Sequence, residues 1–128
     1  MIYLYRRNKT GICIDRVYGH DGIVELPETL EGLPVTELGA YIFSDHIDRG
    51  DLEKCRMSGK FCIEDGLEVQ DGEGMPEMSG NAVQELILPS KLRKVGRYAF
   101  YNCFHLKKLS LGGDLRDVGV GAMTGCHK

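Results

Sequence analysis

The sequence predicts an α/β solenoid in which short parallel strands alternate with short helical turns, with an N-terminal β-hairpin as a cap. Two observations carry this prediction. One is an internal repeat of 23 residues in the C-terminal half, and the other is a degenerate third copy near the N-terminus. The chain of 128 residues fits a single domain, and its 42% hydrophobic and 27% charged residues are typical of a globular protein.

The repeat appears as identical residues that lie 23 positions apart. The pairs are Leu86 and Leu109, Val95 and Val118, Gly96 and Gly119, and Cys103 and Cys126. Residues 24–27 and 38–43 contain a third, less regular copy. A unit of this size cannot bury both of its faces alone, whereas stacked units bury them together, so neighbouring strands should form a parallel ladder.

Each repeat divides into two parts of different period. Residues 83–88 and 106–111 alternate apolar and polar side chains, which is the period of a short strand. Apolar residues then follow at spacings of three and four, which predicts one or two turns of helix with an inward apolar stripe. In the second repeat they are Leu92, Val95, Ala99 and Cys103. The predicted core contains Leu86, Leu88, Val95, Phe100, Leu109, Leu111 and Val118.

The single domain is predicted to have four segments. Strands at residues 2–6 and 12–17 should flank a turn at residues 8–11 and form the hairpin that covers the first repeat. The first repeat carries five extra residues around residues 31–34, which should widen its loop. The segments are the capping hairpin (1–22), the first repeat (23–46), an acidic insertion (47–80), and the second and third repeats (81–128).

The insertion carries nine acidic and four basic residues, a net charge of −5. Its apolar residues are sparse, so a short hairpin, or a helix followed by a loop, is expected. Cys55 and Cys62 lie seven residues apart in it. A disulfide between them, or a metal site that includes Asp45 and His46, stays an alternative, although the ligand spacing typical of zinc sites is missing. No metal and no cofactor is therefore predicted.

The sequence does not indicate a convergent acid, base and nucleophile, so the protein is not predicted to be an enzyme. Cys103 and its repeat equivalent are expected to fill the core, because free cysteine behaves as a small buried hydrophobe. Catalysis by Cys103 with His105 would need a third, orienting group, which is missing. The glycines at one repeat position predict a corner with positive φ, or tight packing, rather than a ligand-binding loop. They are Gly39, Gly96 and Gly119.

Residues 83–126 follow the patterns Leu-x-x-Leu-x-Leu-Pro and Leu-x-x-Val-Gly-x-x-Ala-Phe-x-x-Cys, the last of them with substitutions. This combination resembles the BspA-like leucine-rich repeats of bacteria. Residues 11–27 are similar to the segment that precedes the repeats in that family, and residues 31–39 are similar to its first repeat. The resemblance implies a leucine-rich-repeat solenoid, a scaffold used for binding and often carried by surface proteins. It implies no catalytic residue.

The outward positions of the predicted strands form the surface on which a protein partner would bind. They are Glu25, Glu85, Ile87, Lys108 and Ser110. A register of 23 residues sets Glu85 beside Lys108, where mutual neutralisation is expected rather than a ligand site. The predicted function is a protein-interaction module without catalysis. The alternatives are a fragment or cap of a longer bacterial surface adhesin, and a small-ligand or metal-binding domain that uses residues 47–80.

Charge and hydropathy restrict the partners further. The net charge of −3 is not that of a generally basic nucleic-acid binder. No segment reaches the roughly 20 apolar residues of a membrane span. The N-terminus lacks the apolar stretch of a signal peptide, so the chain as written is expected in the cytoplasm, or at the cell surface if a leader has been removed. Neither nucleic acid nor membrane is predicted as a partner.

The C-terminal end of the repeats suggests one more partner. The sequence stops soon after Cys126, before another strand begins. The strand that contains Leu109 and Leu111 would then have an unpaired edge, and open edges promote pairing with another chain. Self-association through this edge, or membership of a longer array, is expected.

Overall fold

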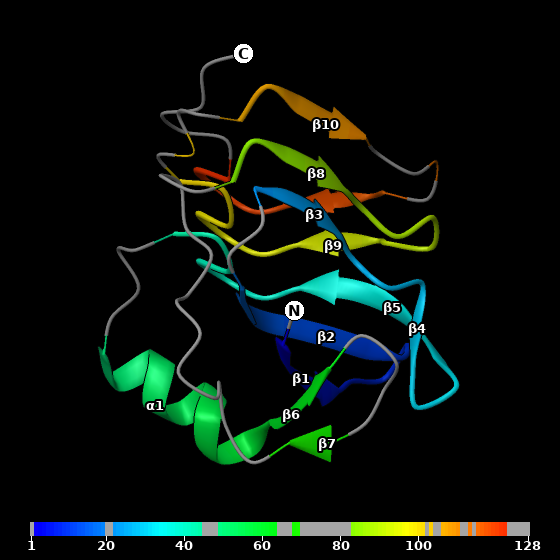
Figure 1. Ribbon diagram of the computed structural model, residues 1–128, viewed down its shortest axis with the longest axis vertical. Coiled ribbons are helices and arrows are strands. Elements are labelled where there is room, and N and C mark those ends of the chain that lie inside the picture. The colour runs from blue at the N-terminus through cyan, green and yellow to red at the C-terminus, as the bar shows by residue number, and fades with distance from the viewer. Residues whose placement is uncertain are drawn as a thin grey trace.

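The computed structural model describes residues 2–19, 22–44, 49–63, 68–69, 83–101, 103, 106–110, 113 and 115–122. The strands in these residues form two sheets (Figure 1). The smaller sheet contains β3 (Ile23–Glu25), β8 (Glu85–Ile87) and β10 (Lys108–Ser110). The larger sheet contains, in spatial order, β11 (Asp117–Val118), β9 (Lys94–Val95), β5 (Leu33–Leu38), β2 (Ile12–Tyr18), β1 (Ile2–Arg7), β6 (Lys60–Ile63) and β7 (Glu68–Val69), with β4 (Thr29–Leu30) paired to β5.

Two parallel ladders connect the repeats. In the first ladder β8 pairs with β3 and with β10, and in the second ladder β5 pairs with β2 and β9, and β9 pairs with β11. Leu86 lies opposite Leu109 and Val95 lies opposite Val118, so the register equals the offset of 23 residues in the sequence. The predicted parallel pairing of the repeats is therefore confirmed.

The main core lies between the two ladders. Successive side chains of a strand point to opposite faces of the sheet, so each ladder turns alternate residues inward. Val24 and Leu86 of the first ladder belong to the same cluster of buried residues as Ile14, Leu38 and Val95 of the second ladder. Each ladder therefore supplies the apolar surface that the other one needs to cover its inner face.

The structure confirms most of the predicted core and corrects one member. Leu109 is partly buried against the core, and Leu111 lies outside the described residues. Val118 is 56% exposed, so the prediction of burial is wrong for this residue. β11 is the last strand of its sheet in the described part of the chain, and no further repeat covers it there. The buried members are Leu86, Leu88, Val95 and Phe100.

Within the described residues, the helical turns that the sequence predicts after each strand are not helices. The chain forms β9 and then tight turns, in which backbone hydrogen bonds join residues three apart. The N–H of Tyr98 donates to the carbonyl of Val120 at 3.0 Å, and that of Phe100 to the carbonyl of Ala122 at 2.9 Å. Because these N–H groups donate to carbonyls of the next repeat, they cannot form the hydrogen bonds of an α-helix. The one helix of the described residues, α1 (Arg49–Ser58), lies in the insertion.

The recurring glycines mark tight packing and not a corner with positive φ. None of Gly39, Gly96 and Gly119 has a positive φ. Each donates its N–H to a carbonyl of the preceding strand in the stack at 2.8 Å. A Cβ atom on Gly96 would lie 2.5 Å from the amide nitrogen of Ala40, which is closer than real Cβ contacts. Glycine is therefore required because one backbone rests directly on the next.

The N-terminal hairpin has the predicted strands. β1 and β2 pair antiparallel across a turn in which the side-chain oxygen of Asn8 accepts the N–H groups of Thr10 and Gly11, at 2.9 and 2.7 Å. Such an Asx turn is a common way to reverse the chain at asparagine. β2 then pairs in parallel with β5, so the hairpin continues the second ladder at the end opposite to β11.

The five extra residues of the first repeat form a tight hairpin and not the wide loop that the sequence predicts. Leu30 of β4 lies opposite Leu33 of β5, which leaves Glu31 and Gly32 as a two-residue turn. Their φ angles are 54° and 76°. Two central residues with positive φ are typical of the type I′ turn, whose twist matches that of the flanking strands.

The insertion contains a helix, and its described residues add two strands to the larger sheet. β6 pairs antiparallel with β1 and with β7, and α1 precedes β6. Phe61 of β6 is only 8% exposed and packs with Ile2, Leu4 and Tyr18 in a second cluster. The sequence left a hairpin or a helix as alternatives, and the described residues contain both. The insertion covers Ile2 and Leu4 of β1 with Phe61 and with the partly buried Cys55 and Val69, so few apolar residues are needed.

The stacking of the repeats predicts the cost of removing Phe100. Its ring is 2% exposed and lies 6.0 Å from the ring of Phe43 in the preceding repeat. We expect Phe100→Ala to lower the free energy of unfolding by about 3–5 kcal/mol, measured by urea denaturation. The control Val120→Ala, at a position 71% exposed, should change it by less than about 0.5 kcal/mol. Equal stability of Phe100→Ala and the native chain would contradict the packing described above.

Candidate functional site

The outward residues of the first ladder form a continuous surface, here called the ladder face. Glu25 and Lys108 are exposed, and Glu85, Ile87 and Ser110 are partly exposed. All five residues that the sequence predicts for the binding surface are therefore accessible. Ile23, which is 50% exposed, belongs to the same face and was missed. Its position two residues before Glu25 in one strand was the signal that could have identified it.

The strand register fixes how these side chains are arranged. One row across the ladder contains Ile23, Glu85 and Lys108, and the next outward row contains Glu25, Ile87 and Ser110. The predicted placement of Glu85 beside Lys108 is confirmed. Neighbouring positions in a row are about 4.8 Å apart, which is the spacing of hydrogen-bonded strands.

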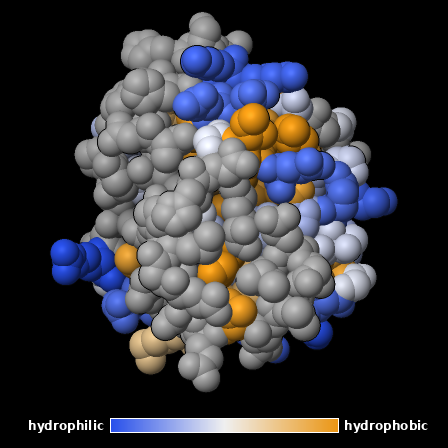
Figure 2. Space-filling view, in the orientation of Figure 1, coloured by the Kyte–Doolittle hydropathy of each residue, from blue (hydrophilic) through white to orange (hydrophobic). Residues whose placement is uncertain are grey.

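The ladder face combines apolar and charged side chains on a rigid backbone. Its outward apolar residues are Ile23 of β3 and Ile87 of β8, and Figure 2 shows apolar surface with hydrophilic side chains beside it on this side of the molecule. Backbone hydrogen bonds continue the ladder beyond the strands, for example from the N–H of Leu26 to the carbonyl of Ile87 at 3.0 Å and from the N–H of Leu88 to that of Ser110 at 3.1 Å. This surface can hold an apolar contact and charge pairs in fixed relative positions.

The cysteines of the described residues are free thiols. Cys103 is 1% exposed and its sulfur donates to the carbonyl of Phe43 at 3.6 Å, as expected of a thiol that fills the core. Cys55 and Cys62 do not form a disulfide. Cys126 and His105 lie outside the described residues.

The described residues contain no group of three or more His, Cys, Asp or Glu side chains placed to hold a metal ion. Asp45 and His46, which the sequence left open as metal ligands, lie outside these residues. The described part of the chain also contains no helix with the length and apolar character needed to cross a membrane.

A polar cluster lies on the outer side of β1 and β2. Asp15 is 3% exposed, and the Nε atom of Arg6 lies 3.0 Å from its carboxylate. Burial raises the pKa of the Asp15 carboxyl, and the charge of Arg6 acts against this rise. The buried thiol of Cys13 donates to the same carboxylate at 3.6 Å, and burial raises the pKa of this thiol. The cluster therefore holds a carboxylate and a guanidinium in a poorly solvated place.

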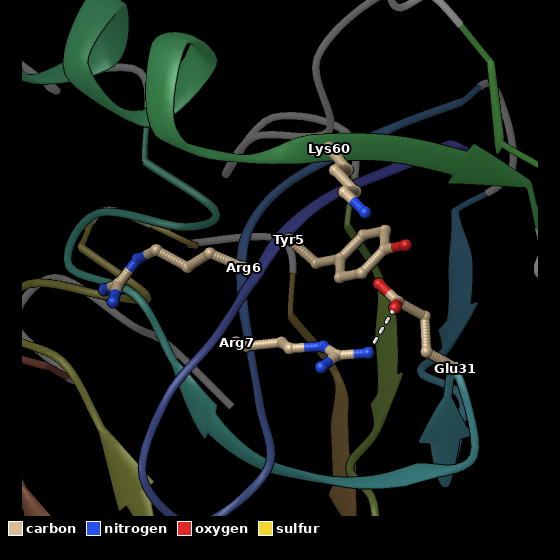
Figure 3. A pocket seen from close by; sticks show the side chains of 5 residues that line it. All are labelled: Tyr5, Arg6, Arg7, Glu31 and Lys60. Atoms are coloured by element: carbon tan, nitrogen blue, oxygen red, sulfur yellow. Dashed lines mark hydrogen bonds and ion pairs between the residues drawn. The ribbon is translucent and has the colours of Figure 1, made fainter.

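A cavity of about 400 Å³ lies where the β4–β5 turn meets β1 and β6 (Figure 3). Arg7 donates to the carboxylate of Glu31 at 2.9 Å, and Tyr5 also donates a hydrogen bond to it. The hydrogen bond from Tyr5 and the contact with Arg7 lower the pKa of Glu31. Glu31 thus ties the turn to β1, which is a structural role. Figure 3 shows Arg6 directed away from this cavity, as strand alternation requires.

Comparison with known proteins shows the fold of this chain. No protein-family model and no curated protein matches the sequence. A solved structure does match: the crystal structure of a leucine-rich repeat protein of T. pallidum, TpLRR, superposes with a TM-score of 0.66 at 23% sequence identity. The match covers 96% of this chain and 42% of the other, so this chain spans less than half the length of that protein. The chain therefore has a leucine-rich-repeat fold.

Proposed function

We propose that the protein is a protein-binding module that uses the ladder face. The observation that carries the proposal is the mixed surface of Ile23, Ile87, Glu85 and Lys108 on a ladder whose register is fixed by parallel pairing. Such surfaces, with an apolar centre and charges around it, are typical of protein interfaces. The polar groups fix the orientation of a partner, and the apolar contact supplies the affinity.

The scaffold of this module is a solenoid of BspA-like leucine-rich repeats. Two parallel ladders with the offset of the sequence repeat support a solenoid, because each repeat adds one strand to each ladder. The glycine at one position of every repeat supports the BspA-like pattern, and so does the Ala-Phe pair that packs Phe100 on Phe43. A binding surface of this kind grows with the number of repeats, without any change in the single unit.

We propose a binding role and not a catalytic one. In the ladder face the polar groups are two carboxylates, an ammonium and a hydroxyl, spread over three strands, and no two of them are placed as nucleophile and base. The thiol of Cys103, the strongest nucleophile type among the predicted candidates, is buried in the core.

The ladder face is tested by the variant Ile87→Asp, which places a charge at its centre. The immobilised native chain should capture a partner from an extract or culture medium of its source cells, and Ile87→Asp should weaken this binding at least about tenfold. The control Glu53→Lys alters an exposed residue of α1 and should bind as the native chain does. Partner binding that is unchanged in Ile87→Asp would show that the ladder face is not the interface.

We also propose that the chain associates with itself, or with further repeats, through β10 and β11. These strands are the outermost ones of the two ladders in the described residues. Val118 in β11 and Val120, two residues after it, are 56% and 71% exposed. Unpaired strand edges with apolar side chains favour strand addition. The longer repeat protein of T. pallidum fits the alternative of a fragment or cap of a longer adhesin, which the full reading frame would reveal.

Sedimentation velocity at micromolar concentration tests self-association. We expect the native chain to form dimers or larger species, and Val120→Asp to shift the equilibrium at least about tenfold towards the monomer. The control Glu53→Lys should associate as the native chain does. A native chain that stays monomeric over the whole concentration range would contradict this part of the proposal.

A further inference from the structure

A second cavity, of about 280 Å³, lies between α1 and the turns that follow β5 and β9. It is formed by segments that are far apart in the sequence. α1 contributes one of its faces, because residues three and four positions apart lie on the same side of a helix. The residues that line the cavity and are used below are Arg6, Tyr41, Asp51, Lys54, Cys55 and Arg97.

The cavity has an excess of positive charge. Arg6, Lys54 and Arg97 face Asp51 and the buried Asp15. Asp15 is already engaged by the Nε atom of Arg6 at 3.0 Å, which leaves the terminal nitrogens of this guanidinium for another acceptor. Arg97 is exposed, and within the described part of the chain it has no ion-pair partner. Guanidinium groups in such positions bind carboxylates through two parallel hydrogen bonds.

A stack of tyrosines borders the cavity. The ring of Tyr41 lies 5.4 Å from the ring of Tyr98 in a stacked arrangement, and the ring of Tyr101 lies 5.6 Å from Tyr98, edge to face. All three side chains are partly exposed. Tyrosine and arginine, which lie side by side here, are among the residue types that contribute most to binding in protein interfaces.

Two of these tyrosines adopt a backbone conformation that normally favours glycine. The φ angles of Tyr41 and Tyr98 are 62° and 52°, and the equivalent residue of the third repeat is Gly121, with a φ of 69°. The positive φ therefore recurs at this position of all three turns, and in the first turn the buried Arg16 also donates to the carbonyls of Tyr41 and Ser44. Glycine would satisfy the turn without strain, so the aromatic side chains are retained at an energetic cost. Strain of this kind concentrates at functional sites.

We propose that the cavity and the tyrosine stack form a docking site for an acidic segment of a partner protein. A carboxylate side chain of the segment enters the cavity between Arg6 and Arg97. An apolar side chain beside it packs on the exposed parts of Tyr41 and Tyr98. This site shares no residue with the ladder face, so it does not depend on the function proposed above.

The charge pattern favours an acidic peptide over a nucleic acid. A nucleic acid brings a row of phosphates, and Asp51 in the same cavity repels any phosphate placed next to it. An acidic peptide can place one of its carboxylates at the cationic side of the cavity and turn its other carboxylates towards solvent. Apolar contact on tyrosine also suits a peptide side chain.

Fluorescence anisotropy with labelled decapeptides tests the site. The probes are an alternating Glu-Leu peptide, an alternating Glu-Ser peptide and an alternating Lys-Leu peptide. The native chain should bind the Glu-Leu peptide best, with both other peptides weaker by at least about fivefold. Arg97→Glu should weaken binding of the Glu-Leu peptide about tenfold, whereas the control Arg116→Glu, an equal change of charge at another exposed arginine, should stay within about twofold.

A second variant distinguishes the contribution of the tyrosine ring to binding from its contribution to folding. Tyr98→Gly removes the ring at a position whose φ suits glycine, so we expect the chain to remain folded, as checked by thermal unfolding. It should still weaken binding of the Glu-Leu peptide about tenfold. Unchanged peptide affinity in either Arg97→Glu or Tyr98→Gly would overturn the proposal.

Alkylation of Cys55 locates the peptide independently of charge. Cys55 lines the cavity and is partly exposed, whereas Cys13, Cys62 and Cys103 are buried. In a Cys126→Ser background, a saturating Glu-Leu peptide should slow the reaction of Cys55 with iodoacetamide at least about threefold. An unchanged rate, a native chain that does not bind the Glu-Leu peptide, or equal binding of an oligothymidylate would each overturn the proposal.

Discussion

The stack of repeats depends on a direct contact between backbones at one position in each repeat. Gly39, Gly96 and Gly119 occupy this position. A Cβ atom on Gly96 or Gly119 would overlap with the backbone of the preceding repeat, and one on Gly39 would overlap with the side chain of Asp15 in β2. The same glycines donate their N–H groups across the contact at 2.8 Å. This contact sets the register of the second ladder, and the first ladder follows because both belong to the same repeat. The shared core and the rows of the ladder face result from that register.

Most of the fold could be predicted because the offset between the sequence repeats equals the register between their paired strands. The offset between Leu86 and Leu109 gave the pairing of the strands, and alternation gave their inward and outward sides. The helical turns could not be predicted, because spacings of three and four also fit a chain whose N–H groups bond to the next repeat. The exposure of Val118 and the tight turn at Glu31 depend on neighbours that no local pattern reveals.

The two candidate sites differ in how far the sequence reveals them. The ladder face follows from strand alternation, which is why Glu25 and Lys108 were found from spacing alone. The cavity at Arg97 combines α1, β1 and two turns, so no periodic signal marks it. In the sequence its residues are charged residues without a recurring spacing and one cysteine of the insertion, which do not indicate a site. Only the folded chain brings Cys55 and Arg97 to one cavity and shows that the tyrosines beside them are strained.

The account rests on the close approach of the repeats, and Gly96→Ala measures it most directly. The added methyl group would lie 2.5 Å from a backbone nitrogen, whereas one on Gly113 would have no atom within 4 Å. We expect Gly96→Ala to lower the free energy of unfolding by about 2–3 kcal/mol in urea denaturation, and Gly113→Ala to change it by less than about 0.5 kcal/mol. If Gly96→Ala unfolds at the same urea concentration as Gly113→Ala, the repeats do not stack through this contact.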